Sequence, residues 1–344
     1  MLPAIRPVLQ KVPVLKSVHW AAAHAMRRAG YRWELRRSGE LKIGLWRKSL
    51  RATPGVPQRK LVLTPGFGDT PMSWIGVLTL LMPTLKKHYD EIVLVDFPGF
   101  SGFLSHEKAF HSMELLKNTF FDVLDSLAPK TLMGHSLGGW LSTLYAVECE
   151  EGTRPKTQSA GPASTYQRPD HLILANPSGV FIDEAATNDL RDKFRKAMGE
   201  EGGFNSIREH VFAHEPFWIR WVAGHFSGFF RSEEVAKFVE SFEPSHLIDE
   251  TRLEKIRSKV WLIWGEDDTL TPPASIPLFL KKLNQDNARC RAILIKKAGH
   301  SPQLEAPAAL AMVLGQVLTE ASGGRARYFN FPASQRFWKL VEEC

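Results

Sequence analysis

The stretch TLMGHSLGGW, residues Thr131 to Trp140, decides the fold of this chain. It sets Ser136 two residues after Gly134 and two before Gly138, directly behind a short apolar run. A serine hydroxyl is a poor nucleophile at neutral pH, so an enzyme that uses one exposes its oxygen on a sharp turn beside a base. The pattern predicts a strand, a nucleophile elbow and a helix, with Ser136 as the nucleophile. Read alone, it also fits a glycine-rich turn with no chemistry.

Apolar segments around this stretch have the lengths and spacing of buried parallel strands. Short apolar runs occupy residues 60–64, 91–96 and 131–134, and segments with helical periodicity lie between them. The same rhythm returns with HLILA, KVWLIWG and RAILI. Continuous apolar strands that alternate with helices indicate a mostly parallel sheet covered by helices on both faces. We therefore predict an α/β fold, opened by a β-hairpin around Ser38 and Gly39.

The alternation of strands and helices divides the chain into five parts. It is suspended between about Val180 and Asp249, where aromatic residues are crowded, and this segment is interpreted as a helical insertion. The expected parts are a basic amphipathic N-terminal arm, the first part of the core, a helical lid insertion, the second part of the core and a C-terminal tail, whose aromatic residues suggest only that it packs on something. Their ranges are 1–30, 31–179, 180–250, 251–320 and 321–344.

Two later segments supply partners for the serine. AGHSPQLEAP places His300 in a loop after the last predicted strand, where an imidazole can reach a serine at a strand end. LIWGEDDTLTP presents Asp267 and Asp268 after the preceding strand, and such a carboxylate fixes the tautomer of the base. Serine, aspartate and histidine thus follow in the order typical of one α/β fold, which favours catalysis over a plain glycine-rich turn.

These pieces resemble the α/β-hydrolase family. The likeness extends from about Tyr31 to Leu318 and is carried by LTPGFGDTPMSW, VLVDFPGFSGF, GHSLGGW, LILANPSG, LIWGEDDTLTP and AGHSPQLEAP. It implies that Asp268, three residues after Gly265, is the triad acid, with Asp267 as the alternative. It also implies an oxyanion hole made by the backbone N–H groups of Phe67 and Leu137. The chain has Pro65-Gly66 where the family commonly has His-Gly, which leaves the shape of that loop open.

The insertion is the part of the chain that selects the substrate. Its aromatic residues recur at helical spacing, so they either seal the insertion onto the sheet or line a substrate site; we assign Trp218, Trp221 and Phe229 to the site. The layout looks like that of monoacylglycerol lipases and lysophospholipases. We predict a serine carboxylester hydrolase for medium or long acyl chains. The alternatives are hydrolysis of a thioester, an amide or a C–C bond in a soluble metabolite, or a non-catalytic binding protein of the same fold.

Charge is distributed unevenly along the chain. The net charge is +7, yet the first 60 residues hold 14 Lys and Arg residues and only two acidic ones. Tryptophans interleaved with these cations favour an anionic membrane surface over nucleic acid, while a merely solvated basic face is the alternative. His210 and His214 stand four residues apart without a third ligand, so we predict neither a metal site nor a cofactor.

Composition limits where the protein works. Hydrophobic residues make up 44% and charged residues 24% of the sequence, and no apolar segment is long enough to span a bilayer. The three cysteines are an odd number without paired spacing, which is typical of proteins in a reducing compartment. Cations interrupt the N-terminal apolar residues before a secretory h-region forms. We predict a cytoplasmic protein with peripheral attachment to a membrane.

Overall fold

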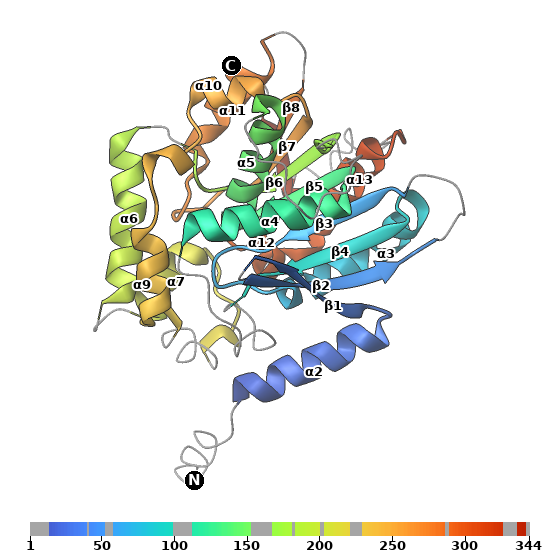
Figure 1. The fold of residues 1–344 in the computed structure, drawn as a ribbon, viewed down its shortest axis with the longest axis horizontal. Helices are drawn as coiled ribbons and strands as arrows, with labels where there is room; N and C mark the ends of the chain where they lie inside the picture. Colours follow the sequence, from blue (N-terminus) through green and yellow to red (C-terminus); the bar gives the residue numbers. More distant parts are fainter. Residues whose placement is uncertain are drawn as a thin grey trace.

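The structure is a computed structural model, shown in Figure 1. Side chains are described from Trp20 onward. None of the helices in the described part has both the length and the apolar run needed to cross a bilayer. The structure describes residues 14–39, 41–51, 58–98, 112–152, 167–180, 183–199, 203–220, 229–285, 289–325 and 336–341.

One nine-stranded sheet organises the chain, in the order β1-β2-β4-β3-β5-β6-β7-β8-β9. Strands β3 to β8 run parallel, whereas β1 and β2 form an antiparallel hairpin and β9 pairs antiparallel with β8. The strand bounds are β1 Arg32–Ser38, β2 Leu41–Ser49, β3 Lys60–Thr64, β4 Glu91–Asp96, β5 Thr131–His135, β6 His171–Ala175, β7 Lys259–Gly265, β8 Cys290–Ile295 and β9 Trp338–Val341.

Burial explains why these segments form strands. Every residue of β4 and β5 is buried, as expected for parallel strands with helices on both faces. The edge strand β1 is mostly exposed and carries Arg32, Arg36 and Arg37, charges that discourage pairing with another chain. The predicted mostly parallel α/β sheet flanked by helices is confirmed.

Helices cover the two faces of the sheet and create two cores (Figure 1). One core joins the strands to α4, α5 and α11, and the other joins them to α2, α3 and α13. Each helix turns an apolar side toward the sheet, so burial of that side stabilises both layers together. The helix bounds are α2 Val14–Arg28, α3 Ile75–His88, α4 Met113–Leu127, α5 Leu137–Glu151, α10 Glu250–Lys255, α11 Ile276–Leu283, α12 Pro302–Glu305 and α13 Pro307–Ala321.

Three further helices lie between β6 and β7 in the chain and form the left side of Figure 1. They are α6 Glu184–Met198, α7 Phe204–Val211 and α9 Glu233–Glu240. A small core of their own holds Phe204, Ile207 and Phe230 against Leu270 from the loop after β7. The insertion therefore packs on the carboxyl end of the sheet, where the predicted catalytic loops lie.

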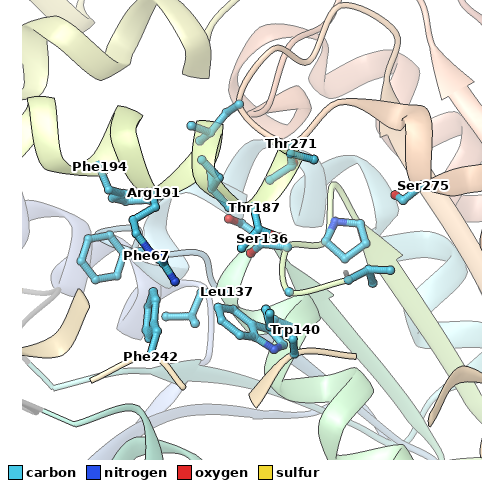
Figure 2. Close-up of a pocket in the computed structure, with 18 of the residues that line it drawn as sticks. Phe67, Ser136, Leu137, Trp140, Thr187, Arg191, Phe194, Phe242, Thr271 and Ser275 are labelled. Carbon is cyan, nitrogen blue, oxygen red and sulfur yellow. The ribbon is translucent and has the colours of Figure 1, made fainter. Parts of the chain in front are cut away.

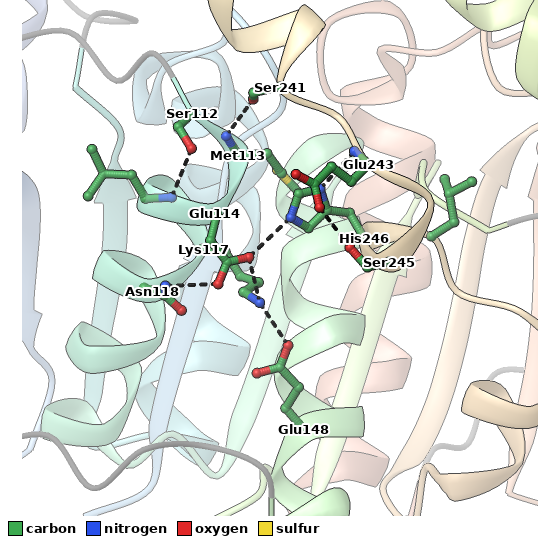
Figure 3. Close-up of polar contacts among 12 residues, drawn as sticks. Ser112, Met113, Glu114, Lys117, Asn118, Glu148, Ser241, Glu243, Ser245 and His246 are labelled. Carbon is green, nitrogen blue, oxygen red and sulfur yellow. Dashed lines mark hydrogen bonds and ion pairs between the residues drawn. The ribbon is translucent and has the colours of Figure 1, made fainter.

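His246 fastens the C-terminal end of the insertion to the core (Figure 3). Its Nδ1 accepts a hydrogen bond of 3.0 Å from the Glu243 N–H, so Nε2 carries the proton and donates to Glu114 of α4 at 3.1 Å. Trp140 of α5 donates its Nε1–H to the His246 carbonyl at 2.7 Å. Ion pairs from Lys117 to Glu114 (2.9 Å) and Glu148 (3.2 Å) extend this network.

The two ends of the described chain pack on the core. In α2, Ala23 and Met26 are buried against the sheet, while Trp20 is 70% exposed. The C-terminal tail adds β9 to the sheet, with Trp338 buried against the core. The tail's aromatic residues did not predict a strand, because its pairing partner β8 lies more than forty residues earlier in the chain.

Candidate active site

Ser136 occupies a strained turn between β5 and α5. Its φ of 52° and ψ of −117° lie outside the usual regions for a residue with a side chain, and the Ser136 N–H donates to the Ala175 carbonyl at 3.0 Å. A Cβ atom at Gly134 would overlap the Gly138 backbone, and one at Gly138 would lie 2.6 Å from the Thr64 carbonyl oxygen. Both glycines are therefore needed for close backbone approach, which is the geometry of a nucleophile elbow.

His300 and Asp268 form a buried acid–base pair. The distance from His300 Nδ1 to Asp268 Oδ2 is 2.9 Å, and the residues are 4% and 3% exposed. Because an ionised carboxylate only accepts hydrogen bonds, Nδ1 carries the proton and Nε2 is left as the basic nitrogen. Asp267, the alternative acid, is exposed. The structure thus places Asp268, and not Asp267, against His300.

Neighbouring donors keep Asp268 ionised. Its Oδ2 accepts from Asn176 Nδ2 at 2.7 Å and from Thr271 Oγ1 at 2.9 Å, and its Oδ1 accepts the N–H groups of Leu270 and Thr271 at 2.9 Å each. Burial by itself raises the pKa of Asp268, but attraction to His300 and these hydrogen bonds outweigh it and hold the pKa below its usual value. The carboxylate is therefore fixed in charge and orientation.

His135, the residue before the nucleophile, supports the base from behind. Its Nε2 lies 2.8 Å from the His300 carbonyl oxygen, which can only accept, so Nε2 carries the proton. The other nitrogen, Nδ1, is buried, has no hydrogen-bond partner among the described residues, and lies 3.8 Å from Asp69 Oδ2. Burial lowers the pKa of His135 to about 3, so its ring stays neutral.

Asp69 brings a second carboxylate into this region. It lies in the loop after β3 and accepts hydrogen bonds from Thr70 N–H at 2.7 Å and Ser73 Oγ at 2.9 Å. Burial raises its pKa to about 6, although these bonds and the charge of His300 oppose the shift. Asp69 thus changes charge in the pH range where a catalytic histidine titrates.

Glu305 joins the base loop to the insertion. Its Oε2 accepts the N–H groups of Ala213 (2.8 Å) and His214 (2.9 Å), and its Oε1 accepts those of Gly299 (3.0 Å) and Ser301 (3.2 Å). In addition, the His300 N–H donates to the carbonyl of Val211, the last residue of α7, at 3.0 Å. The position of the His300 imidazole therefore depends on where the insertion lies.

The two predicted oxyanion donors flank Ser136. Leu137 opens α5, and the N–H groups in the first turn of a helix have no partner within the helix. Phe67 lies in the loop after β3, which a 3.2 Å hydrogen bond from Asp69 N–H to the Gly66 carbonyl folds into a turn. The carbonyls of Thr64 and Pro65 pack directly on Gly138. Pro65 therefore does not prevent the loop after β3 from packing against the nucleophile elbow.

A cavity of about 160 Å³ opens beside Ser136 (Figure 2). Phe67 and Leu137 line it next to the nucleophile, and α6 contributes a wall that includes Leu190, Arg191 and Phe194. Most of the surrounding side chains are apolar. The other lining residues are Trp140, Pro177, Ser178, Gly179, Val180, Ala186, Thr187, Val239, Phe242, Glu243, Pro244, Leu247, Trp264, Leu270, Thr271, Pro272 and Ser275.

The aromatic residues assigned to the substrate site lie elsewhere or outside the described part. Phe229 packs on Phe67, with ring centroids 5.5 Å apart, but does not line the cavity. Trp218 is 38% exposed and also lies away from the cavity lining. Trp221 falls outside the described residues. Within the described residues, the aromatic side chains at the cavity are Phe67, Trp140, Phe194, Phe242 and Trp264.

Sequence reasoning did not assign roles to four residues that build the site. His135, Asn176, Thr271 and Glu305 each lie inside one of the motifs that carried the family resemblance. Their proximity to the motif serine, aspartate or histidine was a signal, but their function depends on contacts between loops that follow different strands. Asn176, for example, reaches across 92 residues of sequence to Asp268.

Solved structures of hydrolases resemble this fold at low sequence identity. A bacterial membrane phospholipase A is 18% identical with a TM-score of 0.66, over 93% of this chain and 96% of that one. The carboxylesterase CesB from Bacillus subtilis is 16% identical with a TM-score of 0.59, over 89% and 99%. The 2-hydroxy-6-oxo-6-phenylhexa-2,4-dienoate hydrolase from Rhodococcus sp. strain RHA1 is 16% identical with a TM-score of 0.59, over 85% and 98%.

No curated protein matches the chain significantly by sequence. The model of the alpha/beta hydrolase family, however, matches residues 61–313, which include the elbow, the acid loop and the base loop described above. Together with the sheet order and the left-handed serine between β5 and α5, this match shows that the chain belongs to the alpha/beta hydrolase family.

Proposed function

We propose that this protein is a serine carboxylester hydrolase that acts through an acyl-enzyme. The observation that carries the proposal is the buried His300–Asp268 pair, 2.9 Å apart, in the same site as a left-handed Ser136 at the edge of an apolar cavity. A strained serine backbone and a buried carboxylate both cost folding free energy. Their combination in neighbouring loops at one edge of the sheet is typical of a catalytic site.

The residues suit a two-step reaction. Ser136 Oγ attacks the acyl carbonyl carbon and passes its proton to His300 Nε2, while the Phe67 and Leu137 N–H groups stabilise the negative oxygen. The bond to the alcohol oxygen then breaks, and Nε2 returns the proton to that oxygen. Water attacks the acyl-enzyme, gives a proton to Nε2, and the acid leaves as Ser136 Oγ regains its proton. Asp268 orients the imidazole and stabilises its charged form throughout.

The cavity favours a medium-length or longer acyl chain. An apolar cavity of about 150 Å³ holds one benzene molecule, so the 160 Å³ beside Ser136 accepts about six carbon atoms before a chain emerges at its mouth. Activity on p-nitrophenyl esters should therefore rise from acetate to about hexanoate and then level off. Leu190→Trp fills the cavity and should move the preference toward acetate.

The first experiment is labelling with a fluorophosphonate probe, comparing the intact protein with Ser136→Ala. Labelling that requires Ser136, followed by ester turnover, supports the proposal. A folded protein that is not labelled would instead favour a binding protein of this fold. Labelling without turnover of any ester in the series would favour a thioester, an amide or a C–C bond as the substrate.

We also propose that the N-terminal arm attaches the protein to an anionic membrane surface. On α2, Trp20 is 70% exposed, and Arg27 and Arg28 occupy the last turn with no acidic residue in the first. Interfacial tryptophan and cationic side chains are typical of helices that lie on a membrane. In the insertion, Phe217 is 74% exposed and would add a second apolar contact.

Flotation with vesicles tests the attachment. Trp20→Ala should reduce binding to vesicles that contain phosphatidylglycerol, and added salt should weaken it further because the attraction is partly electrostatic. Leu80→Ala on α3 is the matched control, since Leu80 is 56% exposed on a different helix. Equal flotation of the intact protein and Trp20→Ala would show that α2 does not attach the protein to the membrane through Trp20.

A further inference from the structure

The cavity beside Ser136 is lined by a cationic side chain that has no role in the proposed reaction. Arg191 of α6 lines the cavity with Phe67 and Leu137. Figure 2 shows its side chain reaching from α6 into the space beside Phe67, Leu137 and Phe242, on the same side of the cavity as the proposed oxyanion loop. Arg191 is exposed, so its side chain meets both the cavity and the solvent.

Arg191 has no carboxylate partner in the part of the chain that the structure describes. Its hydrogen bond is a long one of 3.5 Å to the neutral Asn188 Oδ1. Two nearby cations on α6 are paired with carboxylates, since Lys193 contacts Asp189 at 2.6 Å and Arg195 contacts Asp192 at 3.4 Å.

One carboxylate does line the cavity, but its own contacts are local. The Glu243 side chain accepts from the backbone of His246 in a capping box and from Ser245 Oγ at 3.3 Å. The guanidinium of Arg191 is therefore available to a ligand, and its forked N–H donors match the oxygens of a phosphate or a carboxylate.

We propose that Arg191 selects acyl esters that carry an anionic group close to the scissile bond. This inference rests on the proposed ester hydrolase function, because it assumes that the acyl carbonyl is held at Ser136. An anion on the alcohol side meets the guanidinium when the acyl chain lies in the apolar cavity, and an anion on the acyl side meets it when the acyl chain points toward Arg191. Two sources share this chemistry: the phosphate of a lysophospholipid headgroup on the alcohol side, and a carboxylate at the far end of a short acyl chain.

Matched substrates test the selection. One pair is monobutyrin and butyryl glycerol phosphate, which differ only in the phosphate and stay monomeric in water. The other pair is p-nitrophenyl butyrate and mono-p-nitrophenyl glutarate, which differ in a terminal carboxylate. Arg191→Ala should lower kcat/KM for the anionic member of one pair by about 10- to 100-fold, the range expected for a lost hydrogen bond to a charged group. The neutral members should change by less than about threefold.

Control variants separate this effect from overall charge. Arg195→Ala removes the same charge from the same helix at a residue outside the cavity lining, and it should leave both ratios unchanged. Arg191→Lys keeps the positive charge but lacks the paired N–H donors of the guanidinium, so it should recover part of the preference for the anionic ester. A loss confined to the phosphate pair identifies a lysophospholipid-like substrate, and a loss confined to the glutarate pair identifies an acyl carboxylate.

The outcomes also distinguish this inference from the proposed function. If all four esters are turned over and Arg191→Ala changes neither ratio, the selection by Arg191 is wrong while the ester hydrolase function stands. If none is turned over although Ser136 is labelled, the ester assignment itself fails, and the selection that rests on it falls as well.

Discussion

The Nε2–H of His135 donates a hydrogen bond of 2.8 Å to the main-chain carbonyl of His300, across 165 residues of sequence. The elbow that presents Ser136 is thereby fastened to the loop that carries His300. Since the same elbow packs on the loop that carries Phe67, three loops meet at residues 134–138. Catalysis depends on sub-ångström placement of these parts.

Replacing His135 should impair catalysis without impairing binding. His135→Ala removes the donor that holds the His300 carbonyl, so kcat should fall by about 10- to 100-fold with little change in KM. His135→Gln offers an amide N–H in a similar position and should recover part of the loss. Steady-state kinetics on a p-nitrophenyl ester measure both. Equal kcat for the intact protein and His135→Ala would show that this bond does not position the base.

The same residue should make the fold sensitive to acid. Burial lowers the pKa of His135 from 6.5 to about 3, so the folded state holds the ring neutral while the unfolded state protonates it below pH 6.5. The stability is therefore fully present above pH 6.5 and is lost as the pH falls toward 3. At pH 5 the loss from this group should be about 2 kcal/mol. Urea unfolding at pH 8 and pH 5 should show a smaller acid loss in His135→Gln.

Replacing Asp69 should raise the stability of the protein and lower its activity. Because the pKa of Asp69 is raised to about 6, this carboxyl contributes most to the stability of the protein while it is protonated. That contribution is lost as the pH rises from 3.8 through 6. Asp69→Asn should therefore unfold at higher urea concentration at pH 8, with a gain of about 1 to 2 kcal/mol.

The activity of Asp69→Asn should show the opposite sign. Above pH 6 the ionised Asp69 attracts the imidazolium that forms on His300, and the amide cannot. We expect kcat at pH 8 to fall about threefold to tenfold, and the difference from the intact protein to shrink at pH 5. A constant ratio from pH 5 to pH 8 would contradict this role.

The two adjacent aspartates should differ sharply. Asp268→Asn leaves the shape of the site but removes the charge that fixes the His300 tautomer, so kcat should fall by about 10³- to 10⁴-fold. Asp267→Asn is the matched control, because Asp267 is exposed and should retain nearly full activity. Circular dichroism establishes that both variants are folded. Similar losses of kcat in both variants would show that Asp268 is not the triad acid.

Glu305 should couple the insertion to the base. Glu305→Ala leaves four backbone N–H groups without their acceptor, in both the base loop and the segment after α7. We expect a loss of about 2 to 3 kcal/mol in the free energy of unfolding. Amide hydrogen exchange should speed up at residues 213–214 and at 299–301 together. Faster exchange in only one of these segments would show that Glu305 does not link them.

Much of the fold, and the placement of Ser136, Asp268 and His300 at one edge of the sheet, follows from sequence because both depend on local patterns. A short apolar strand must be buried, and glycines at positions 134 and 138 permit the turn that Ser136 adopts. The carboxyl ends of parallel strands meet at one edge, so residues after β5, β7 and β8 come together whatever the details of packing.

Only the tertiary structure decided what surrounds the triad. Asn176 on Asp268, His135 on the His300 carbonyl and Glu305 on the insertion are contacts between separate loops, and no local pattern records which loops touch. For the same reason, aromatic spacing in the insertion pointed to Trp218 and Phe229, whereas packing on the sheet placed Arg191 and Phe194 at the cavity. The sequence by itself determined which reactive side chains follow the strand ends, and the packing of the insertion decided the cavity, because helical spacing sets which residues share a face but not what that face meets.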